Sequence, residues 1–535
     1  MKNFTDLNLG FTDAINYNRK ENKDLFNKFF VKSPQLDELL KGNIYYLIGE
    51  KGTGKTAFAV FLSNNNYKGS TGAINFISET EYEKFIILRE EHHLTLSDYT
   101  SIWKVLLLLL MSQHLKKGED TYTLFRNNLR YKTLEDAIQE FYHNAFAPEI
   151  INALSIIENS DEAVEIMSKV LDLNAKHSIS LQSSQSSFQI NLLFLEKAFK
   201  ECISRLKLSQ DHILFIDGID IRPRGIEYES YLECIRGLAQ ATWQLNALFF
   251  GNIKDSKGRL RIVLLLRPDI FAHLGLQNLN NKLHDNSVLL DWKTTYPTYR
   301  TSSLFQLIDR ILSVQQDEDY NLGECWDYYF PFRNVDSDGE RDSFVSFLRF
   351  SMSRPRDIIS MLQSIRDYAQ QVRPTVVSVS ASDFDNSEFR MSHSKYMLGE
   401  IKDYLAFYHT DEDYSLFLKF FEFLHGKAKF TYDEYLQAYN EFANYIEHNN
   451  LNVPAFFNND SDFLQFLYDM DVICYIVDLE GNEKHIHWSY RERNYSNINP
   501  KVQEYRNYSI HYGLRKLFDT GRRHAMKREI RKFVE

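Results

Sequence analysis

The chain has 535 residues, of which 44% are hydrophobic and 25% are charged. Such a length predicts three or four structural units, and such a composition is typical of a globular protein with a sizeable core. The formal net charge of -11 argues against a protein that coats nucleic acid through its overall electrostatic field.

Cysteine spacing and hydropathy further restrict the class of protein to which the chain can belong. The four scattered cysteines form no C-x-x-C pair, so they indicate neither a zinc site nor a disulfide framework. The first residues lack the apolar core of a signal peptide. The most apolar run, Ile102–Met111, is interrupted by Lys104 and is too short to cross a bilayer. We therefore expect a soluble protein of the cytoplasm with no membrane partner.

A glycine-rich segment follows an expected N-terminal arm, residues 1–40, and the first predicted strand, about Asn43–Ile48. It matches the phosphate-loop pattern G-x-x-x-x-G-K-[ST], and the apolar run Ala57–Leu62 continues it as a helix. A strand before and a helix after are the context that this pattern requires. The alternative is a glycine-rich turn without a ligand. We predict a nucleotide-binding loop made of Gly49, Glu50, Lys51, Gly52, Thr53, Gly54, Lys55 and Thr56.

The loop pattern assigns a role to its last two residues. Backbone N–H groups of such a loop and the N-terminus of the following helix form an anion cradle. Lys55 is expected to reach the β- and γ-phosphates, and the Thr56 hydroxyl is expected to coordinate Mg²⁺. The predicted cofactors are therefore a nucleoside triphosphate and Mg²⁺.

A long helical block interrupts the predicted sheet. A second strand is expected at Ala73–Ile77, and from Glu79 to about Leu208 the apolar spacing becomes helical, for example in Ser101–Leu115 and Leu192–Leu206. We interpret residues of about 80–208 either as an insertion in the nucleotide domain or as a cap over it. The sequence indicates no role for this block.

The sheet resumes with an apolar strand, His212–Asp217, that ends in an acid. Downstream of a phosphate loop, such an Asp is typical of the Walker B element, so Asp217 is predicted to hold the Mg²⁺ shell. No Glu follows it directly. Asp220 is the nearest acid that could polarise an attacking water, and its alternative role is that of a turn or helix-cap residue.

A further strand, beginning at Arg261, brings Arg267 to its C-terminal end. Because ligands of open parallel sheets gather at the carboxyl ends of strands, Arg267 is a candidate sensor of the γ-phosphate. The alternative is an ion pair with Asp269 that fixes the loop. A last strand is expected at Val288–Trp292, and we place the nucleotide-binding core at about residues 41–300.

A helical lid is predicted for residues 301–390. Within it, residues 343–371 have a helical pattern, and Pro355 is typical of a helix start. Arg356 is our candidate for a lid residue that reaches the γ-phosphate. The alternative is surface ion pairing with Asp357 or Asp367.

The C-terminal part, residues 395–535, is predicted to be a winged-helix-like domain with a basic tail. Helical patterns at Tyr414–Leu424, Tyr432–Ile446 and Ser461–Met470 lead into a hairpin of Val472–Val477 and Lys484–Tyr490. From Phe430 to Glu483 there is no Lys or Arg, so this face should be repelled by DNA phosphates. We interpret it as a protein-contact or autoinhibitory domain. Two histidines of the wing, at 485 and 487, share a face, but alone they do not indicate a metal site.

Together these segments resemble a known class of proteins. The phosphate loop, the Walker B segment Leu214–Asp220, Arg267 and the lid sequence Arg354–Asp357 look like the AAA+/STAND side of the phosphate-loop ATPases. More narrowly, "GEKGTGKTA", "LLLRPDIF" and "RPRDII" resemble a poorly characterised set of bacterial P-loop ATPases that are often encoded near mobile or defence genes. The chain departs from AAA+ enzymes at Gly218, where they usually have a catalytic Glu.

The resemblance implies an α/β fold, ATP and Mg²⁺ as ligands, slow hydrolysis, and a homo-oligomer that controls a partner effector, plausibly in anti-phage defence. Asp217, Asp220, Arg267 and Arg356 are the expected catalytic residues, with Thr56 and Asp217 at the metal. Two other functions remain open: a DNA-binding initiator or loader that uses the winged helix and the tail, and a scaffold that binds nucleotide without turnover.

Overall fold

The computed structural model of the chain describes residues 1–77, 96–118, 185–223, 225–336, 339–478 and 484–520. The chain forms two compact units: unit 1 comprises Met1–Ser33, Glu50–Gly54 and Asp291–Glu535, and unit 2 comprises Pro34–Gly49 and Lys55–Leu290. The middle of the glycine-rich loop therefore belongs with unit 1 and its two ends with unit 2. None of the helices in these described ranges combines the length and the hydropathy that a membrane span requires.

Unit 2 is built on a five-stranded parallel sheet with the order β2-β3-β4-β1-β5. The strands are β1 (Tyr46–Ile48), β2 (Ser70–Phe76), β3 (Asp211–Asp217), β4 (Leu260–Leu266) and β5 (Ser287–Leu289). All seven residues of β4 are buried, as are the last six of β3. Strands covered on both faces are typical of parallel sheets in α/β proteins. The predicted α/β class with a parallel sheet is confirmed.

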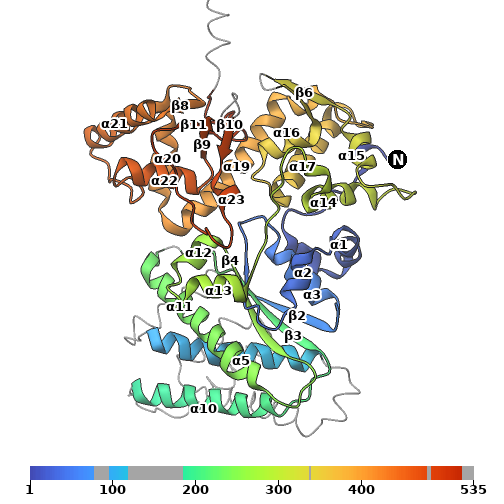
Figure 1. Cartoon of the computed structure of the whole chain (residues 1–535), viewed down its shortest axis with the longest axis vertical. Coiled ribbons are helices and arrows are strands. Elements are labelled where there is room, and N and C mark those ends of the chain that lie inside the picture. The colour runs from blue at the N-terminus through green and yellow to red at the C-terminus, as the bar shows by residue number, and fades with distance from the viewer. Residues whose placement is uncertain (78–95, 119–184, 224, 337–338, 479–483, 521–535) are drawn as a thin grey trace, which may run out of the picture. The chain divides into compact units, whose positions relative to one another are not determined.

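Helices pack against this sheet and against one another. Figure 1 shows α5 (Leu96–Gly118) lying beside α10 (Gln185–Ser204) and α11 (Tyr228–Trp243). The helices predicted at 101–115 and 192–206 are confirmed by α5 and α10, and the rest of the predicted insertion, 78–95 and 119–184, lies outside the described residues. The other helical segments of unit 2 are α2 (Pro34–Leu39), α3 (Lys55–Asn64), η4 (Gln244–Phe249), η5 (Phe250–Asn252), α12 (Pro268–His273) and α13 (Leu279–Asn286).

The first core of unit 1 joins the N-terminal residues to a group of helices. Its buried side chains come from Phe4 to Phe29 and from Tyr299 to Phe389. The helical pattern predicted at 343–371 and the helix start predicted at Pro355 are confirmed: one helix ends at Phe350, and the next begins with Pro355 at its first position. The segments are η1 (Phe4–Asp6), η2 (Ala14–Asn18), η3 (Lys20–Asn22), α1 (Lys23–Phe29), η6 (Tyr299–Thr301), α14 (Ser303–Ser313), α15 (Glu324–Tyr329), β6 (Arg333–Asp336), β7 (Gly339–Asp342), α16 (Ser343–Phe350), α17 (Pro355–Val372) and α18 (Ala381–Phe384).

A second core of unit 1 is aromatic-rich and lies in the C-terminal part of the chain. It packs helices against a four-stranded antiparallel sheet with the order β10-β9-β11-β8. Helix α21 starts with a capping box of Thr431 and Glu434. The segments are α19 (Ser387–Tyr408), α20 (Asp411–Phe420), η7 (Phe421–Leu424), β8 (Lys429–Thr431), α21 (Tyr432–His448), α22 (Asp460–Asp469), β9 (Ile473–Asp478), β10 (Lys484–His487), α23 (Ser489–Glu492) and β11 (Asn507–Ile510).

The predicted hairpin and helices of this part are confirmed, but its sheet is larger than predicted. Strands β9 and β10 pair antiparallel, as the wing prediction requires. Strands β8 and β11 were not predicted; β11 pairs with both β9 and β8 and so doubles the sheet. The predicted basic tail, 521–535, lies outside the described residues.

Candidate nucleotide-binding site

The order of the strands in unit 2 places a switch point between β1 and β4. The chain leaves β1 toward β2, on one side of the sheet, whereas it leaves β4 toward β5, on the other side of β1. In open α/β sheets, ligands bind outside the carboxyl ends of the strands at such a point. The residues that follow β1 are Gly49–Thr56, Arg267 follows β4, and Asp217 ends the adjacent strand β3. Unit 2 thus brings the ends of these three strands to one edge of the sheet.

The loop after β1 has the backbone that its glycines predict. Gly52 and Gly54 adopt φ angles of 85° and 92°, in the left-handed region that favours glycine. Thr53 closes a turn, because its N–H and its hydroxyl both donate to the Glu50 carbonyl, at 3.2 and 2.8 Å. Helix α3 then begins at Lys55. A turn that opens a helix N-terminus is the arrangement that binds phosphate oxygens.

The two predicted Mg²⁺ ligands contact each other. The Thr56 hydroxyl donates a hydrogen bond of 2.6 Å to the Asp217 carboxylate. The other carboxylate oxygen accepts the Gly218 N–H at 2.9 Å. Burial raises the pKa of Asp217, and the Asp220 charge adds to this, while Thr56 and Lys55 act in the opposite direction. A hydroxyl and a carboxylate held together offer the hard oxygen donors that Mg²⁺ prefers, so this pair fits the predicted cation.

Lys55 lies beside this pair. Its side chain is buried, and its ammonium group donates to the Gly49 carbonyl at 2.8 Å. An ammonium group is a compact point charge with three donors, suited to phosphate oxygens. Its charge lowers the pKa of Asp217, so the two groups interact electrostatically. The residues present therefore fit a bound triphosphate.

Position 218 has no room for a side chain. Gly218 adopts a φ of 85°, and a Cβ atom built there would lie 2.3 Å from the Ile77 carbonyl oxygen. Asp220, two residues on, is half-buried and raises the pKa of Asp217 by its charge. The predicted acid is therefore near the carboxylate of β3, and no side chain at 218 intervenes.

The structure gives Arg267 the contact that was the alternative to a sensor role. Its guanidinium binds Asp269 through two hydrogen bonds, of 3.1 and 2.7 Å. The Arg267 side chain is 1% exposed, and the pair forms at the start of α12. This contact fixes the turn between β4 and α12.

Unit 1 contains the other part of the loop together with the start of α17. The Arg356 N–H donates to the Gly52 carbonyl at 3.4 Å, and a Cβ built at Gly52 would lie 3.1 Å from the Arg356 Cβ. The guanidinium of Arg356 lies 3.5 Å from Glu400 and donates to the Thr12 carbonyl at 3.1 Å. Arg356 is thus against the glycine loop, and it pairs with Glu400 rather than with the two aspartates considered above.

Arg354 is a residue of the lid sequence for which the sequence alone indicated no separate role. It is buried, and it forms two hydrogen bonds with Asp357, of 2.9 and 2.8 Å. A third donor of the same guanidinium binds the Lys51 carbonyl at 2.9 Å. An Arg before a helix-starting Pro, with an Asp three residues later, was a sequence signal for this contact.

The variable side chains of the loop also have partners in unit 1. Glu50 forms an ion pair with Arg493, and Lys51 forms one with Asp403 and lies 3.9 Å from Glu400. No sequence pattern indicated these partners, because 443 residues separate Glu50 from Arg493. The loop is therefore held through its side chains as well as its backbone.

A buried acid lies next to these charges. Asp471 follows α22, and its carboxylate accepts the Tyr490 N–H at 3.0 Å. Burial raises the pKa of Asp471 to about 7, with Glu50 acting in the same direction and Arg493 and Arg354 opposing it. This acid therefore changes charge near neutral pH beside two arginines that bind the loop.

The comparisons with known proteins give no family. A scan against protein-family models finds no match to this chain, and a search of curated proteins finds none either. The support for a function therefore comes from the geometry of the chain.

Proposed function

We propose that this chain binds ATP with Mg²⁺ at the loop Gly49–Thr56 and hydrolyses it slowly, as a nucleotide-dependent switch or oligomeric scaffold for a partner effector. The observation that carries the proposal is the 2.6 Å contact between Thr56 and Asp217, next to the buried Lys55. The choice of ATP, and a role in bacterial anti-phage defence, rest on the resemblance of the motifs.

Each polar residue near the carboxyl ends of the strands has a role in this proposal. The Lys55 ammonium, which donates to the Gly49 carbonyl, would hold the β- and γ-phosphate oxygens. Thr56 and Asp217 hold the Mg²⁺ shell. Bound Mg²⁺ neutralises charge on the phosphate oxygens. Asp220 orients or polarises the attacking water.

Slow turnover follows from the acid that is available. A carboxylate directly after Asp217 is excluded, because position 218 accommodates no side chain. Asp220 must act from a turn that is half-exposed to water, where an acid is less desolvated than in a buried site. The same observation favours the second candidate, a scaffold that binds ATP without turnover.

The contacts of unit 1 support a switch. Arg354 binds the Lys51 carbonyl, and Arg493 and Asp403 bind the side chains of Glu50 and Lys51. A ligand that changes the backbone of residues 50–54 changes these contacts as well. In this proposal, a change in the conformation of the loop therefore changes its contacts with the C-terminal part of the chain.

The test compares variants of the loop edge with matched surface controls. Lys55→Ala and Asp217→Asn are paired with Lys68→Ala and Asp37→Asn, whose side chains form an exposed ion pair in the same unit. ATP affinity is measured with a fluorescent analogue, and hydrolysis by phosphate release. A hydrogen bond to a charged group contributes about 1.5–3 kcal/mol, so Lys55→Ala is expected to weaken binding about tenfold to hundredfold.

The remaining variants distinguish ATP hydrolysis from ATP binding. Asp217→Asn is expected to abolish Mg²⁺-dependent phosphate release, Asp220→Asn to reduce it, and the controls to match the wild type. The scaffold alternative would be favoured over an ATPase if Lys55→Ala lost ATP binding while neither the wild type nor any variant released phosphate. Equal ATP affinity in Lys55→Ala and the wild type would refute the site.

The same preparations test the switch by amide hydrogen exchange. ATP with Mg²⁺ is expected to change exchange in peptides that contain Asp403 and Arg493 in the wild type but not in Lys55→Ala. Unchanged exchange in both segments at saturating nucleotide would show that the contacts of the loop do not transmit its state.

A further inference from the structure

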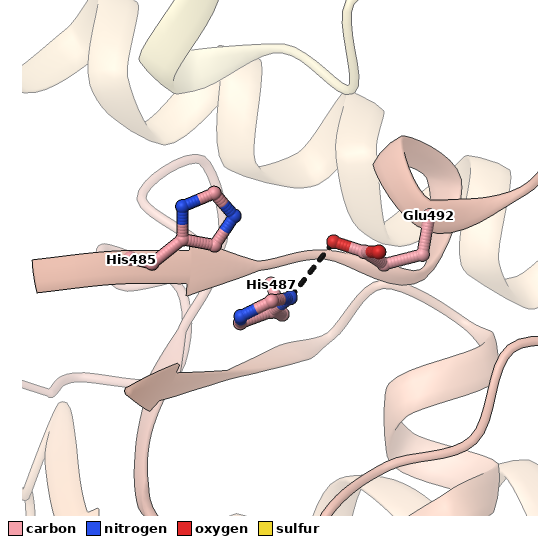
Figure 2. A group of neighbouring side chains, drawn as sticks. All are labelled: His485, His487 and Glu492. Atoms are coloured by element: carbon pink, nitrogen blue, oxygen red, sulfur yellow. Dashed lines mark hydrogen bonds and ion pairs between the residues drawn. The ribbon is translucent and has the colours of Figure 1, made fainter. Parts of the chain in front are cut away.

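The edge strand β10 carries a cluster of metal-ligating side chains away from the loop. His485 and His487 are two residues apart on this strand, so their side chains lie on the same face. Figure 2 shows both imidazoles with the carboxylate of Glu492, which comes from the end of α23. One ligand atom from each of the three residues lies within 4.8 Å of the other two. The sequence indicated only the two histidines; the third group is brought in by the fold.

The spacing is close to that of a single coordination sphere. Zinc–nitrogen and zinc–oxygen distances are about 2.0–2.2 Å, so ligand atoms around one ion lie about 3–3.5 Å apart. His487 Nδ1 is 2.8 Å from Glu492 Oε1, and the two imidazole centroids are 4.3 Å apart. The ligand atoms, which lie within 4.8 Å of one another, would have to approach to about 3–3.5 Å, and His485 is exposed.

The central ligand is already oriented by its neighbours. The ring of Tyr475 stacks on His487 with a centroid distance of 4.5 Å and an interplanar angle of 6°. Tyr475 is also its partner in the register of β9 and β10. Glu492 contacts the ring from another side, because its Oε1 atom lies 2.8 Å from His487 Nδ1. His487 therefore presents its ring at a fixed place on the sheet.

We propose that His485, His487 and Glu492 bind one divalent transition-metal ion of the nitrogen-preferring class, with Zn²⁺ as the reference. Imidazole suits zinc, cobalt and nickel, whereas Mg²⁺ prefers all-oxygen sites, so this site and the Thr56–Asp217 pair select different ions. Three protein ligands leave a coordination position open for water or a further ligand. The ion ties the edge strand β10 to α23. This inference does not depend on nucleotide binding.

An ordinary ion pair elsewhere in the same unit provides the control. His425 Nε2 lies 3.0 Å from Glu441, against 2.8 Å for the pair on β10, and the two glutamates have similar exposure, although His425 is more exposed than His487. Within the described residues, the group of three ligands is found only at His485, His487 and Glu492. His425→Ala thus removes a His–Glu contact without removing the proposed site.

The experiment titrates the chelator-treated full-length chain with Zn²⁺ alone by calorimetry, and with Co²⁺ by visible absorbance. Because the chain has 16 histidines, the result is the difference between variants. His485→Ala, His487→Ala and Glu492→Gln are each expected to remove one equivalent of metal or weaken it at least tenfold. His425→Ala is expected to match the wild type.

Two outcomes separate a metal site from a structural contact. His485 is exposed, so His485→Ala should leave the metal-free melting temperature unchanged and still lose the Co²⁺ spectrum. A wild type that binds no more Zn²⁺ than His485→Ala and His487→Ala would overturn the proposal. Loss in His425→Ala equal to that in His487→Ala would overturn it too, because the binding would then be nonspecific.

Discussion

The Arg354–Asp357 pair is a buried contact whose removal should have a measurable effect on stability. Arg354→Met removes a charge from a side chain that is 8% exposed and leaves the fully buried Asp357 without its cation. Breaking a buried pair in this way destabilises a protein by about 3–5 kcal/mol. Asp357 keeps hydrogen bonds from the Met352 N–H and the Tyr396 hydroxyl, both at 2.9 Å. We therefore expect a loss near the lower bound, about 3 kcal/mol.

Arg366→Met is the matched control for this change. Arg366 also forms two hydrogen bonds with a neighbouring aspartate and a third with a backbone carbonyl, of Leu7. Its partner Asp367 is 57% exposed, so solvent screens the pair and the expected loss is at most about 1 kcal/mol. Urea unfolding, monitored by circular dichroism, measures the loss of stability in both variants from the shift of the unfolding transition.

A pH series distinguishes an unpaired charge from lost packing. Burial alone would raise the pKa of Asp357, but Arg354 outweighs it and holds this pKa below its ordinary value. In the wild type this stabilisation is present above the unfolded pKa and is lost as the pH falls through the folded one. In Arg354→Met the folded pKa rises instead, so protonation stabilises the variant. The difference between the two proteins should therefore shrink from pH 7 toward pH 4.

The double variant Arg354→Met with Asp357→Asn completes the cycle. Removal of both charges should recover part of the stability, because no buried charge then remains unpaired. Equal losses in Arg354→Met and Arg366→Met, or a double variant whose loss is the sum of the single losses, would refute this account of the pair.

Two further predictions concern Asp471 and Gly218. The pKa of Asp471 is raised to about 7 from 3.8, so the folded state binds more protons and stability falls by about 4 kcal/mol as the pH rises through this window. Asp471→Asn should remove this decline in urea titrations between pH 4 and 7; an equal slope in both proteins would contradict it. Gly218→Ala places a side chain at a φ of 85° against the Ile77 carbonyl, so it should cost at least about 1–2 kcal/mol and reduce phosphate release. A variant as stable and active as the wild type would contradict the steric reasoning.

The elements that the sequence predicted are those with local determinants. Strand β3 is a continuous apolar run that ends at Asp217, and the loop before α3 is specified by glycines and Lys55 within eight residues. Strands β8 and β11 have only three and four residues, so their short alternation of polar and apolar residues did not distinguish them from loops. They form because β11 pairs with β9, a contact that the tertiary fold supplies.

The same distinction applies to the candidate site. Thr56 and Asp217 could be predicted as partners, because Asp217 ends a recognisable strand and Thr56 begins the helix that follows another one. The partners of Glu50 and Lys51 could not, because Arg493 and Asp403 lie in elements that follow the whole sheet in the sequence. The assignment of Arg267 was ambiguous for a physical reason: an Arg two residues before an Asp satisfies either role, and the structure shows the pair.

The departure at Gly218 has a structural reason. AAA+ enzymes, which the motifs resemble, usually carry a catalytic Glu at this position, but here the backbone has a φ of 85° and faces the Ile77 carbonyl. A Glu would require both a strained conformation and a displaced β2 terminus. In the function that we propose, a catalytic acid would then come from outside this position, and Asp220 is the residue whose charge raises the pKa of Asp217. The backbone turn at the end of β3 is thus our reason to propose slow hydrolysis rather than a fast motor.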